Sequence, residues 1–283
     1  MNYPIKNAIV IGVGGVANFC AVELKKRGVS VSFIESRLGT VGTSEAICTK
    51  NGIPYSCMEK AELTQRLLAI ADETLIVSAS NRYLFPKEVL EKENLTVINY
   101  HGALLPKFPG RNAEAWAIFE QESCGGITWH RVIADVDAGD VLVQKSIPLT
   151  AKMTSFLLLR EYAKLAQVGF KEIVDGVLAG TLSGTKQTGP RDKIRYSWMK
   201  PNDGFFSMNW SLDKMSAFLR SMDYGPLQTL GDAQISIGGV DMRIVSYSTS
   251  EQGHLDEAES VLLIRRCGLT IGLRIENNDE KAP

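Results

Sequence analysis

The stretch NAIVIGVGGVANFCAVELKKRG, residues 7–28, joins a short apolar run to a glycine-rich turn and then to a segment with helical spacing. An apolar run that ends in glycines is typical of a buried strand. The spacing of Phe19, Val22 and Leu24 predicts a helix after the turn, and Gly28 is a helix stop. The stretch therefore predicts a strand, a tight turn and a helix in succession.

The same alternation of strand and helix patterns continues as far as residue 101, which indicates an α/β fold with a parallel sheet. The predicted strands are residues 29–35, 74–80 and 95–101, and the predicted helices are 61–73 and 86–93. Two further strand patterns, residues 125–133 and 139–149, are joined by only the short segment 134–138. So short a connection requires an antiparallel pair, so we expect a Rossmann-like mixed sheet.

The second half of the chain changes character. Residues 155–180 predict a long amphipathic helix, and residues 182–203 are rich in Gly, Lys, Pro and Ser. After a further helix that Ser211 would cap, glycine turns separate short strands, with a hairpin through Gly238 and Gly239. We expect a catalytic domain at 1–190, a linker at 191–210 and a small C-terminal domain at 211–283, a helix plus a β-barrel-like set of strands.

The composition indicates an ordinary globular enzyme or binding protein. Of the 283 residues, 45% are hydrophobic and 22% are charged, and the net charge of −1 gives no reason to expect nucleic acid or an anionic membrane as partner. No apolar run reaches the roughly 18 residues of a membrane helix. The start lacks the features of a signal peptide, and the five cysteines are scattered without a CxxC pair. We therefore expect a cytoplasmic protein without disulfides or a bound metal.

The turn GVGGVAN fits the GxGxxA pattern of dinucleotide-binding folds, and Glu35 ends the second predicted strand, where an acidic residue would hold a ribose. Glycines there let backbone amides approach a phosphate. Two other interpretations remain open: another anion or ligand binds there, or the glycines serve packing alone.

A second polar group stands at the end of the strand 95–101. Alternation places Asn99 and His101 on one face, about 6.6 Å apart, at the carboxyl end where open α/β sheets bind ligands. Asp135 and Asp137 lie in the acidic turn ADVDAG. An imidazole and a carboxamide can donate hydrogen bonds to a developing oxyanion, and a carboxylate can orient the imidazole, so the group suits acyl transfer without a covalent enzyme intermediate. The alternative is that Asn99 and His101 cap the strand structurally.

The segments INYHGALLPKFPG and GITWHRVIADVDAGDVLVQ resemble the 10-formyltetrahydrofolate-dependent formyltransferases. That family carries N-x-H followed by LLP, and later G-x-T-x-H with D-x-G-x-(I/V)-x-x-Q. The resemblance implies the formyltransferase fold, 10-formyltetrahydrofolate as formyl donor, and no metal. It further implies that Asn99 and His101 stabilise the tetrahedral intermediate, and that Asp137 handles proton transfer and tunes His101.

The resemblance also implies roles for neighbouring residues. We expect the folate pocket to be lined by residues from three places: the segment after the strand 74–80, the loop after the strand 95–101, and the turn that begins at residue 133. These residues are Arg82, Tyr83, Leu84, Leu105, Ile133, Ala134 and Asp135. We expect His130 and Thr128 to contact the catalytic residues and hold them in place, without touching the substrate. At the glycine-rich turn, Gly14, Gly15 and Asn18 would meet the phosphate of the acceptor, and a dinucleotide becomes less favoured.

The acceptor is the open question. From Lys200 to Pro283 there are 8 Lys or Arg and 12 Asp or Glu, a net charge of −4, which argues against tRNA as a partner because cations hold its phosphates. The phrases RNAEAWAIFEQ and FLRSMDYGP resemble enzymes of natural-product assembly lines, which implies a small amine or a carrier-protein-bound aminoacyl group as acceptor. The alternatives are a nucleotide-linked amino sugar, release of formate by hydrolysis, and, from another class, a dinucleotide-binding oxidoreductase or ligand-binding module.

Overall fold

The computed structural model describes residues 3–36, 44–250, 262–266 and 269–278, and the chain divides into two compact units. Unit 1 comprises residues 1–109, 126–146 and 162–194; unit 2 comprises residues 110–125, 147–161 and 195–283. Both units thus draw on separated parts of the sequence. These units describe which residues pack together and do not test whether 1–190 and 211–283 are separate domains. The expected division into those domains stays a prediction.

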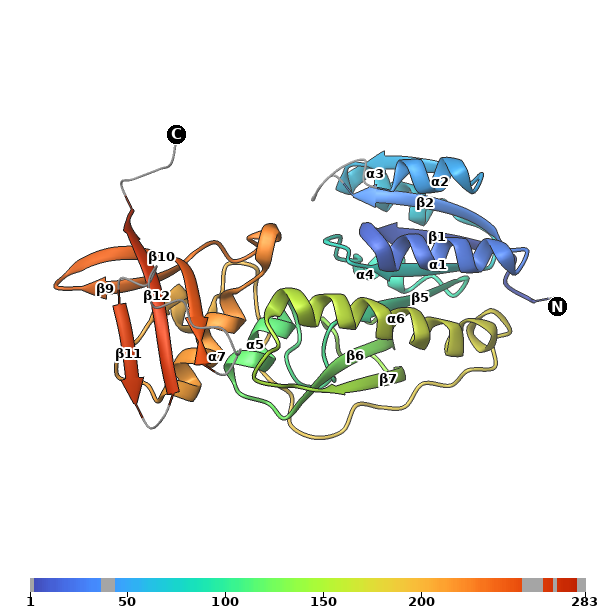
Figure 1. Cartoon of the computed structure of the whole chain (residues 1–283). Coiled ribbons are helices and arrows are strands. Elements are labelled where there is room, and N and C mark those ends of the chain that lie inside the picture. Colours follow the sequence, from blue (N-terminus) through green and yellow to red (C-terminus); the bar gives the residue numbers. More distant parts are fainter. Residues whose placement is uncertain (1–2, 37–43, 251–261, 267–268, 279–283) are drawn as a thin grey trace. The chain divides into compact units, whose positions relative to one another are not determined.

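A mixed seven-stranded sheet forms the centre of unit 1 (Figure 1). Its strands follow the order β3-β2-β1-β4-β5-β6-β7, in which β1 to β5 pair in parallel and β6 is antiparallel to β5. This confirms the predicted α/β class with a mixed, Rossmann-like sheet. The strands are β1 Asn7–Gly12, β2 Ser30–Ser36, β3 Tyr55–Met58, β4 Thr74–Ala79, β5 Leu95–His101, β6 Cys124–Arg131 and β7 Val141–Pro148.

Five helices accompany these strands in the described part of the chain: α1 Gly14–Lys26, α2 Glu45–Lys50, α3 Lys60–Leu68, α4 Lys87–Leu90 and α6 Ser155–Leu178. The sequence patterns predict α1, α3, α4 and α6 but miss α2 and β3. The strand β3 has four residues, of which only Met58 is buried, so it carries no alternating pattern that sequence inspection can detect.

The strand β6 separates two environments by alternation. Trp129 is fully buried, its indole Nε1 donates to the backbone oxygen of Ala166 at 2.9 Å, and its ring lies 5.2 Å from that of Phe170, both on α6. Because successive side chains of a strand point to opposite faces, Thr128 and His130 point away from α6. Packing of α6 against Trp129 therefore fixes which face of the sheet carries the polar side chains.

Unit 2 is built on a five-stranded sheet with the order β11-β12-β10-β9-β8. The predicted hairpin through Gly238 is present between β9 and β10, and Ser211 caps its helix, accepting a hydrogen bond from the Lys214 amide at 3.3 Å. Within the expected linker, Phe205 and Phe206 form β8, which pairs with β9. The remaining elements are α5 Ala113–Phe119, η1 Pro201–Gly204, β8 Phe205–Phe206, α7 Leu212–Met222, η2 Gly225–Leu227, β9 Ala233–Ile237, β10 Val240–Thr249, β11 Leu262–Arg266 and β12 Leu269–Asn277.

The core of unit 2 explains why a segment from the middle of the chain belongs to it. Ala115 of α5 is fully buried in the same apolar cluster as Phe218 of α7 and Leu273 of β12, and Phe119 packs against that cluster. The helix α5 therefore completes this core rather than that of unit 1. Among the described residues, no helix combines the length and the apolar character that a membrane crossing requires.

Candidate active site

Asn99 and His101 lie on the face of the sheet that Trp129 leaves free, at the end of β5. In the antiparallel register, Asn99 is opposite His130 and His101 is opposite Thr128. Directly opposed residues of such a pair point to the same face. The four side chains therefore form one polar group, of which His101, Thr128 and His130 are buried.

Both ring nitrogens of His101 face oxygen atoms. Nε2 lies 2.9 Å from the backbone oxygen of Phe108, and Nδ1 lies 3.5 Å from Oδ2 of Asp137. Because a carbonyl oxygen can only accept, Nε2 carries a proton and donates a hydrogen bond to the Phe108 oxygen. When Nδ1 also carries a proton, that N–H faces an oxygen that can accept it. The expected pairing of His101 with Asp137 is therefore present in the structure.

His130 holds Asn99 in one orientation. Its Nδ1 lies 2.8 Å from the backbone oxygen of Arg131 and must donate to it, so in the neutral ring Nε2 accepts from Nδ2 of Asn99 at 3.1 Å. The same Nε2 lies 3.4 Å from Oδ1 of Asp137. His130 thus fixes which end of the Asn99 amide points inward, and Asp137 lies between the two imidazole rings.

The loop after β5 is held in place by Thr128 and Gln144. The Thr128 hydroxyl donates to the backbone oxygen of Ala103 at 2.7 Å and accepts from the Leu105 amide at 3.2 Å. Nε2 of Gln144 donates to the Leu105 oxygen and to the Thr128 hydroxyl, both at 2.9 Å. These contacts fix the start of the loop. The loop continues through a cis Leu105–Pro106 bond to Phe108, whose carbonyl accepts from His101.

The turn that carries Asp137 depends on special backbone geometry. Asp137 has φ +51°, in the left-handed region that Asp tolerates better than most residues. A Cβ at Gly139 would meet the backbone oxygen of Arg131 at 1.9 Å, so only glycine fits there. The Arg131 amide also donates to the Asp140 oxygen at 2.9 Å, which closes the turn. The turn therefore places Asp137 beside His101 and His130.

This arrangement suits addition of a nucleophile to a carbonyl carbon. The Asn99 amide and an Nδ1–H of His101 are donors for a developing oxyanion, and Asp137 is a carboxylate that can accept a proton. The side chains are largely buried, at 7% exposure for His101 and 10% for Asp137, so water screens them little.

The two segments expected to bind folate lie over one core cluster. Tyr83 is part of it, and Phe85 and Val132 pack against it, while Leu84 and Ile133 are exposed at 67% and 46%. Alternation thus leaves two apolar side chains available to cover a flat ring. Of the other expected residues, Arg82, Ala134 and Asp135 are exposed and Leu105 is buried.

Tyr83 contributes through packing in this structure. Its hydroxyl lies 2.9 Å from Oγ1 of Thr64, and its backbone amide and carbonyl both bind the Asn81 side chain. Burial raises the pKa of the phenol. A contact of Tyr83 with folate stays a prediction.

At the glycine-rich turn the structure supports a packing role for one glycine. A Cβ at Gly12 would meet the backbone oxygen of Ala79 at 1.8 Å, whereas Cβ atoms at Gly14 and Gly15 would meet nothing within 4 Å. Oδ1 of Asn18 is buried without a hydrogen-bond partner. Glu35 is fully buried and accepts from the Ser44 amide at 2.8 Å, so its carboxylate is not presented to a ribose.

Two contributors to the site have no signal in the sequence. The Phe108 backbone oxygen acts through a carbonyl that every residue possesses. Gln187, near the end of the expected catalytic domain and in a stretch noted only for its Gly, Lys, Pro and Ser, donates to the backbone oxygens of Asp137 and Gly139. Only tertiary packing brings either of them to the site.

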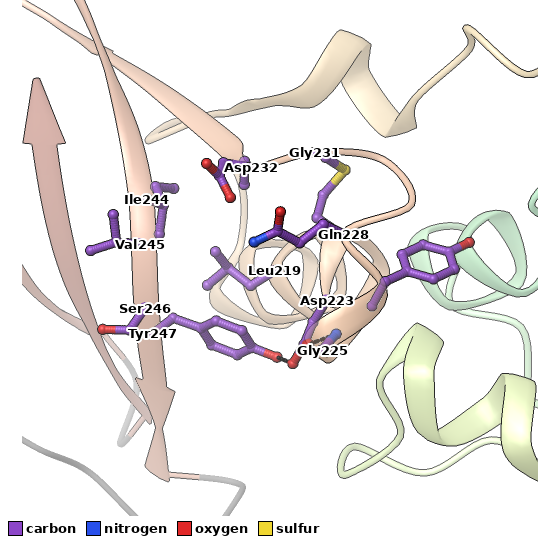
Figure 2. A pocket seen from close by; sticks show the side chains of 13 residues that line it. Leu219, Asp223, Gly225, Gln228, Gly231, Asp232, Ile244, Val245, Ser246 and Tyr247 are labelled. Carbon is purple, nitrogen blue, oxygen red and sulfur yellow. Dashed lines mark hydrogen bonds between the residues drawn. The ribbon is translucent and has the colours of Figure 1, made fainter. Parts of the chain in front are cut away.

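Unit 2 contains a separate pocket of about 360 Å³ (Figure 2). Its lining includes the apolar side chains of Leu219 and Ile244 and the carboxylates of Asp223 and Asp232. Asp223 accepts from the Tyr247 hydroxyl at 2.9 Å, the contact dashed in Figure 2. The thirteen lining residues, all within the described chain, include no Lys, Arg or His, so the pocket does not suit an anionic ligand.

Comparison with known proteins places this chain in a family. The family described as "Formyl transferase" matches residues 25–174, slightly more than half of the chain. Methionyl-tRNA formyltransferase of Desulfotalea psychrophila is 28% identical over 230 residues, which covers 80% of this chain and 69% of that protein. GDP-perosamine N-formyltransferase of Brucella melitensis is 26% identical over 230 residues, covering 79% and 87%.

A solved structure shares the fold over nearly the whole chain. It is an N-formyltransferase from Helicobacter canadensis in complex with folinic acid and dTDP-3-aminofucose, with a TM-score of 0.71, 14% identity, and coverage of 96% of this chain and 100% of that one. The resemblance seen in the sequence motifs is therefore confirmed. The matched segment contains Asn99, His101 and Asp137. The chain belongs to the formyl transferase family and is an enzyme that transfers formyl groups.

Proposed function

We propose that this enzyme transfers the formyl group of 10-formyltetrahydrofolate to the primary amine of a nucleotide-linked amino sugar. The observation that carries the chemistry is the contact of His101 Nδ1 with Asp137 at 3.5 Å, beside an Asn99 amide that His130 orients. The relatives support the amino-sugar alternative better than the expected assembly-line acceptor, because one of them acts on GDP-perosamine and a structural neighbour holds dTDP-3-aminofucose.

Each residue of the trio has one task in this reaction. Asn99 and the Nδ1–H of His101 donate to the formyl oxygen as the amine nitrogen bonds to the formyl carbon and negative charge develops. Asp137 holds the His101 ring through its contact with Nδ1 and accepts the proton that the attacking amine loses. When the bond from the formyl carbon to the folate nitrogen breaks, that nitrogen takes up a proton, and the folate leaves as tetrahydrofolate.

The folate donor fits the exposed apolar surface of unit 1. Leu84 and Ile133 are exposed next to a cluster that contains Tyr83 and against which Phe85 and Val132 pack. A pterin ring would cover these two side chains and remove apolar area from water. Structural neighbours that contain folate derivatives support the same donor.

Charge and aromatic surface favour a nucleotide over tRNA. Residues 200–283 carry 8 cations against 12 anions, which opposes the many phosphate contacts that tRNA requires. Unit 2 carries the stacked rings of Tyr196 and Trp198, 4.7 Å apart and inclined by 3°, with Trp198 73% exposed. A planar base can stack on such a surface.

The test is a panel of acceptors offered to the purified enzyme with 10-formyltetrahydrofolate: GDP- and dTDP-linked amino sugars, an aminoacylated carrier protein, methionyl initiator tRNA, and buffer alone. We expect a mass gain of one CO unit only in a sugar nucleotide, read by mass spectrometry. Formylation confined to the tRNA or to the carrier protein would overturn the proposed acceptor. Formate release in buffer at the rate seen with every amine would indicate hydrolysis instead.

A further inference from the structure

A single segment, residues 187–192, contacts both loops that hold the catalytic candidates. At one end, Nε2 of Gln187 donates to the backbone oxygens of Asp137 at 2.8 Å and Gly139 at 2.9 Å, and the Arg191 guanidinium donates to the oxygen of Val136. At the other end, Asp192 accepts from the Phe108 amide at 3.0 Å. All these residues belong to unit 1.

Gln187 stabilises a turn that would not hold this shape by itself. The backbone of Asp137 is left-handed, a conformation that is unfavourable for most non-glycine residues and persists only where the surroundings fix it. The two carbonyls that Gln187 binds lie on either side of Ala138, so one carboxamide fixes the backbone on both sides of the bend. The direction of the Asp137 side chain follows from that backbone.

Asp192 restrains the backbone that contacts His101, as Gln187 restrains the turn of Asp137. Phe108 also has a positive φ, +52°, which is unfavourable for a bulky residue. Its amide is bound by the Asp192 carboxylate, and the Asp192 amide binds the Pro106 oxygen at 3.4 Å. The carbonyl of Phe108 accepts from Nε2 of His101, so holding the amide of the same residue restrains that carbonyl and, through it, the imidazole.

We propose that Gln187 and Asp192 are positioning residues, which act through backbone carbonyls to hold Asp137 and His101 at their contact distance. The inference rests on the proposed roles of His101 and Asp137. Neither residue touches the reacting atoms in this scheme. Together they join the two halves of the site, which come from different loops, through one short stretch of chain.

The test compares Gln187→Met, which keeps the length but removes both donors, with Thr188→Val at the exposed next position. We expect kcat to fall about 10- to 100-fold in Gln187→Met, as for a catalytic group displaced by about 1 Å, with KM changed little, while Thr188→Val retains wild-type kcat. Asp192→Ala should behave like Gln187→Met, and Asp192→Asn should recover most of the loss because it keeps an acceptor for the Phe108 amide.

A second readout does not depend on the acceptor. The chain has three histidines, so the imidazole nitrogens can be assigned by NMR with His101→Gln as reference. In Gln187→Met we expect the His101 nitrogen resonances to shift, and in Thr188→Val we expect them to stay. Unchanged His101 resonances together with unchanged kcat would overturn the inference.

Comparison with Asp137→Asn separates this inference from the proposed function. If Asp137→Asn keeps turnover, the proposed function fails, whatever Gln187 does. If Asp137→Asn loses turnover and Gln187→Met does not, only the positioning role fails. In the double variant we expect no further loss beyond Asp137→Asn, because Gln187 acts through that side chain.

Discussion

Nδ1 of His101 lies 3.5 Å from Oδ2 of Asp137, although one residue ends a strand and the other stands in a turn far along the chain. The backbone oxygen of Phe108 takes the other ring nitrogen. Both ring nitrogens thus face oxygen atoms of the protein, which fixes the orientation of the ring.

Removing either member of this pair should abolish most turnover. We expect Asp137→Asn and His101→Gln each to lower kcat by about 10²- to 10⁴-fold, the range for general acid–base groups. Asn tolerates a positive φ as Asp does, so the turn should persist and the thermal midpoint should stay near that of the wild type. Near-normal kcat in both variants would contradict the proposed chemistry.

His130 should matter through Asn99. In His130→Leu the Asn99 amide loses its acceptor at 3.1 Å, so we expect kcat to fall about 10-fold or more while the fold remains. Adding Asn99→Ala to this variant should cost much less than Asn99→Ala costs alone, because the two residues act as one unit. Fully additive losses in this double-mutant cycle would argue against the orienting role.

The glycine-rich turn offers a matched pair of variants for stability. Gly12→Ala places a Cβ 1.8 Å from the Ala79 oxygen, so we expect the free energy of unfolding to fall by about 1–3 kcal/mol. Gly15→Ala adds a Cβ in open space within α1 and should leave stability equal or raise it by up to about 1 kcal/mol. Chemical denaturation measures both, and equal losses would show that backbone clash is not the cause.

The Arg27–Asp175 ion pair predicts a pH-dependent contribution to stability. Its closest N–O distance is 2.7 Å, and hydrogen bonds from Arg27 and Tyr3 lower the pKa of Asp175 below its usual value of 3.8. A carboxyl group with a lowered folded-state pKa stabilises the fold above its unfolded pKa, and the gain disappears as pH falls through the folded pKa.

We therefore expect Arg27→Met to lower stability at pH 7 and to lose this difference as the pH falls below about 3.8. Asp175 is 44% exposed, so solvent screening limits its pair to about 0.2–1 kcal/mol. Arg27 also binds Glu23 at 3.0 Å, and Asp175→Asn is the control that isolates the longer-range pair. A stability difference that stays constant from pH 7 to pH 2 would contradict this account.

Trp198 should report nucleotide binding if the acceptor is a sugar nucleotide. We expect Trp198→Ala to weaken binding of the free nucleoside diphosphate by about 5- to 150-fold, equivalent to about 1–3 kcal/mol of base stacking. Tyr196→Phe keeps the second ring and should bind normally. Isothermal titration of both variants makes the comparison, and unchanged affinity in Trp198→Ala would remove this surface from the acceptor site.

Several elements could be predicted because their signal is local. The buried strands β1, β4 and β5 and the helix α6 follow from apolar runs and helical spacing, and Ser211 was recognisable as a cap. Where the signal was short or depended on distant packing, prediction failed, as for α2 and β3. The place of α5 in the core of unit 2 depends on contacts with α7 that no local pattern encodes.

The sequence by itself determined the chemical types of the site and their order along the chain: an asparagine and a histidine on one strand face, and an aspartate in a glycine-bearing turn. Alternation and motif spacing suffice for that, because they are properties of neighbouring residues. The tertiary structure alone decided which atoms meet. Loops that fold back over the sheet bring in the Phe108 carbonyl and the Gln187 carboxamide, and they place Asp137 between His101 and His130. Hydrogen bonds to backbone atoms cannot be recognised from residue types, because every residue has a backbone carbonyl.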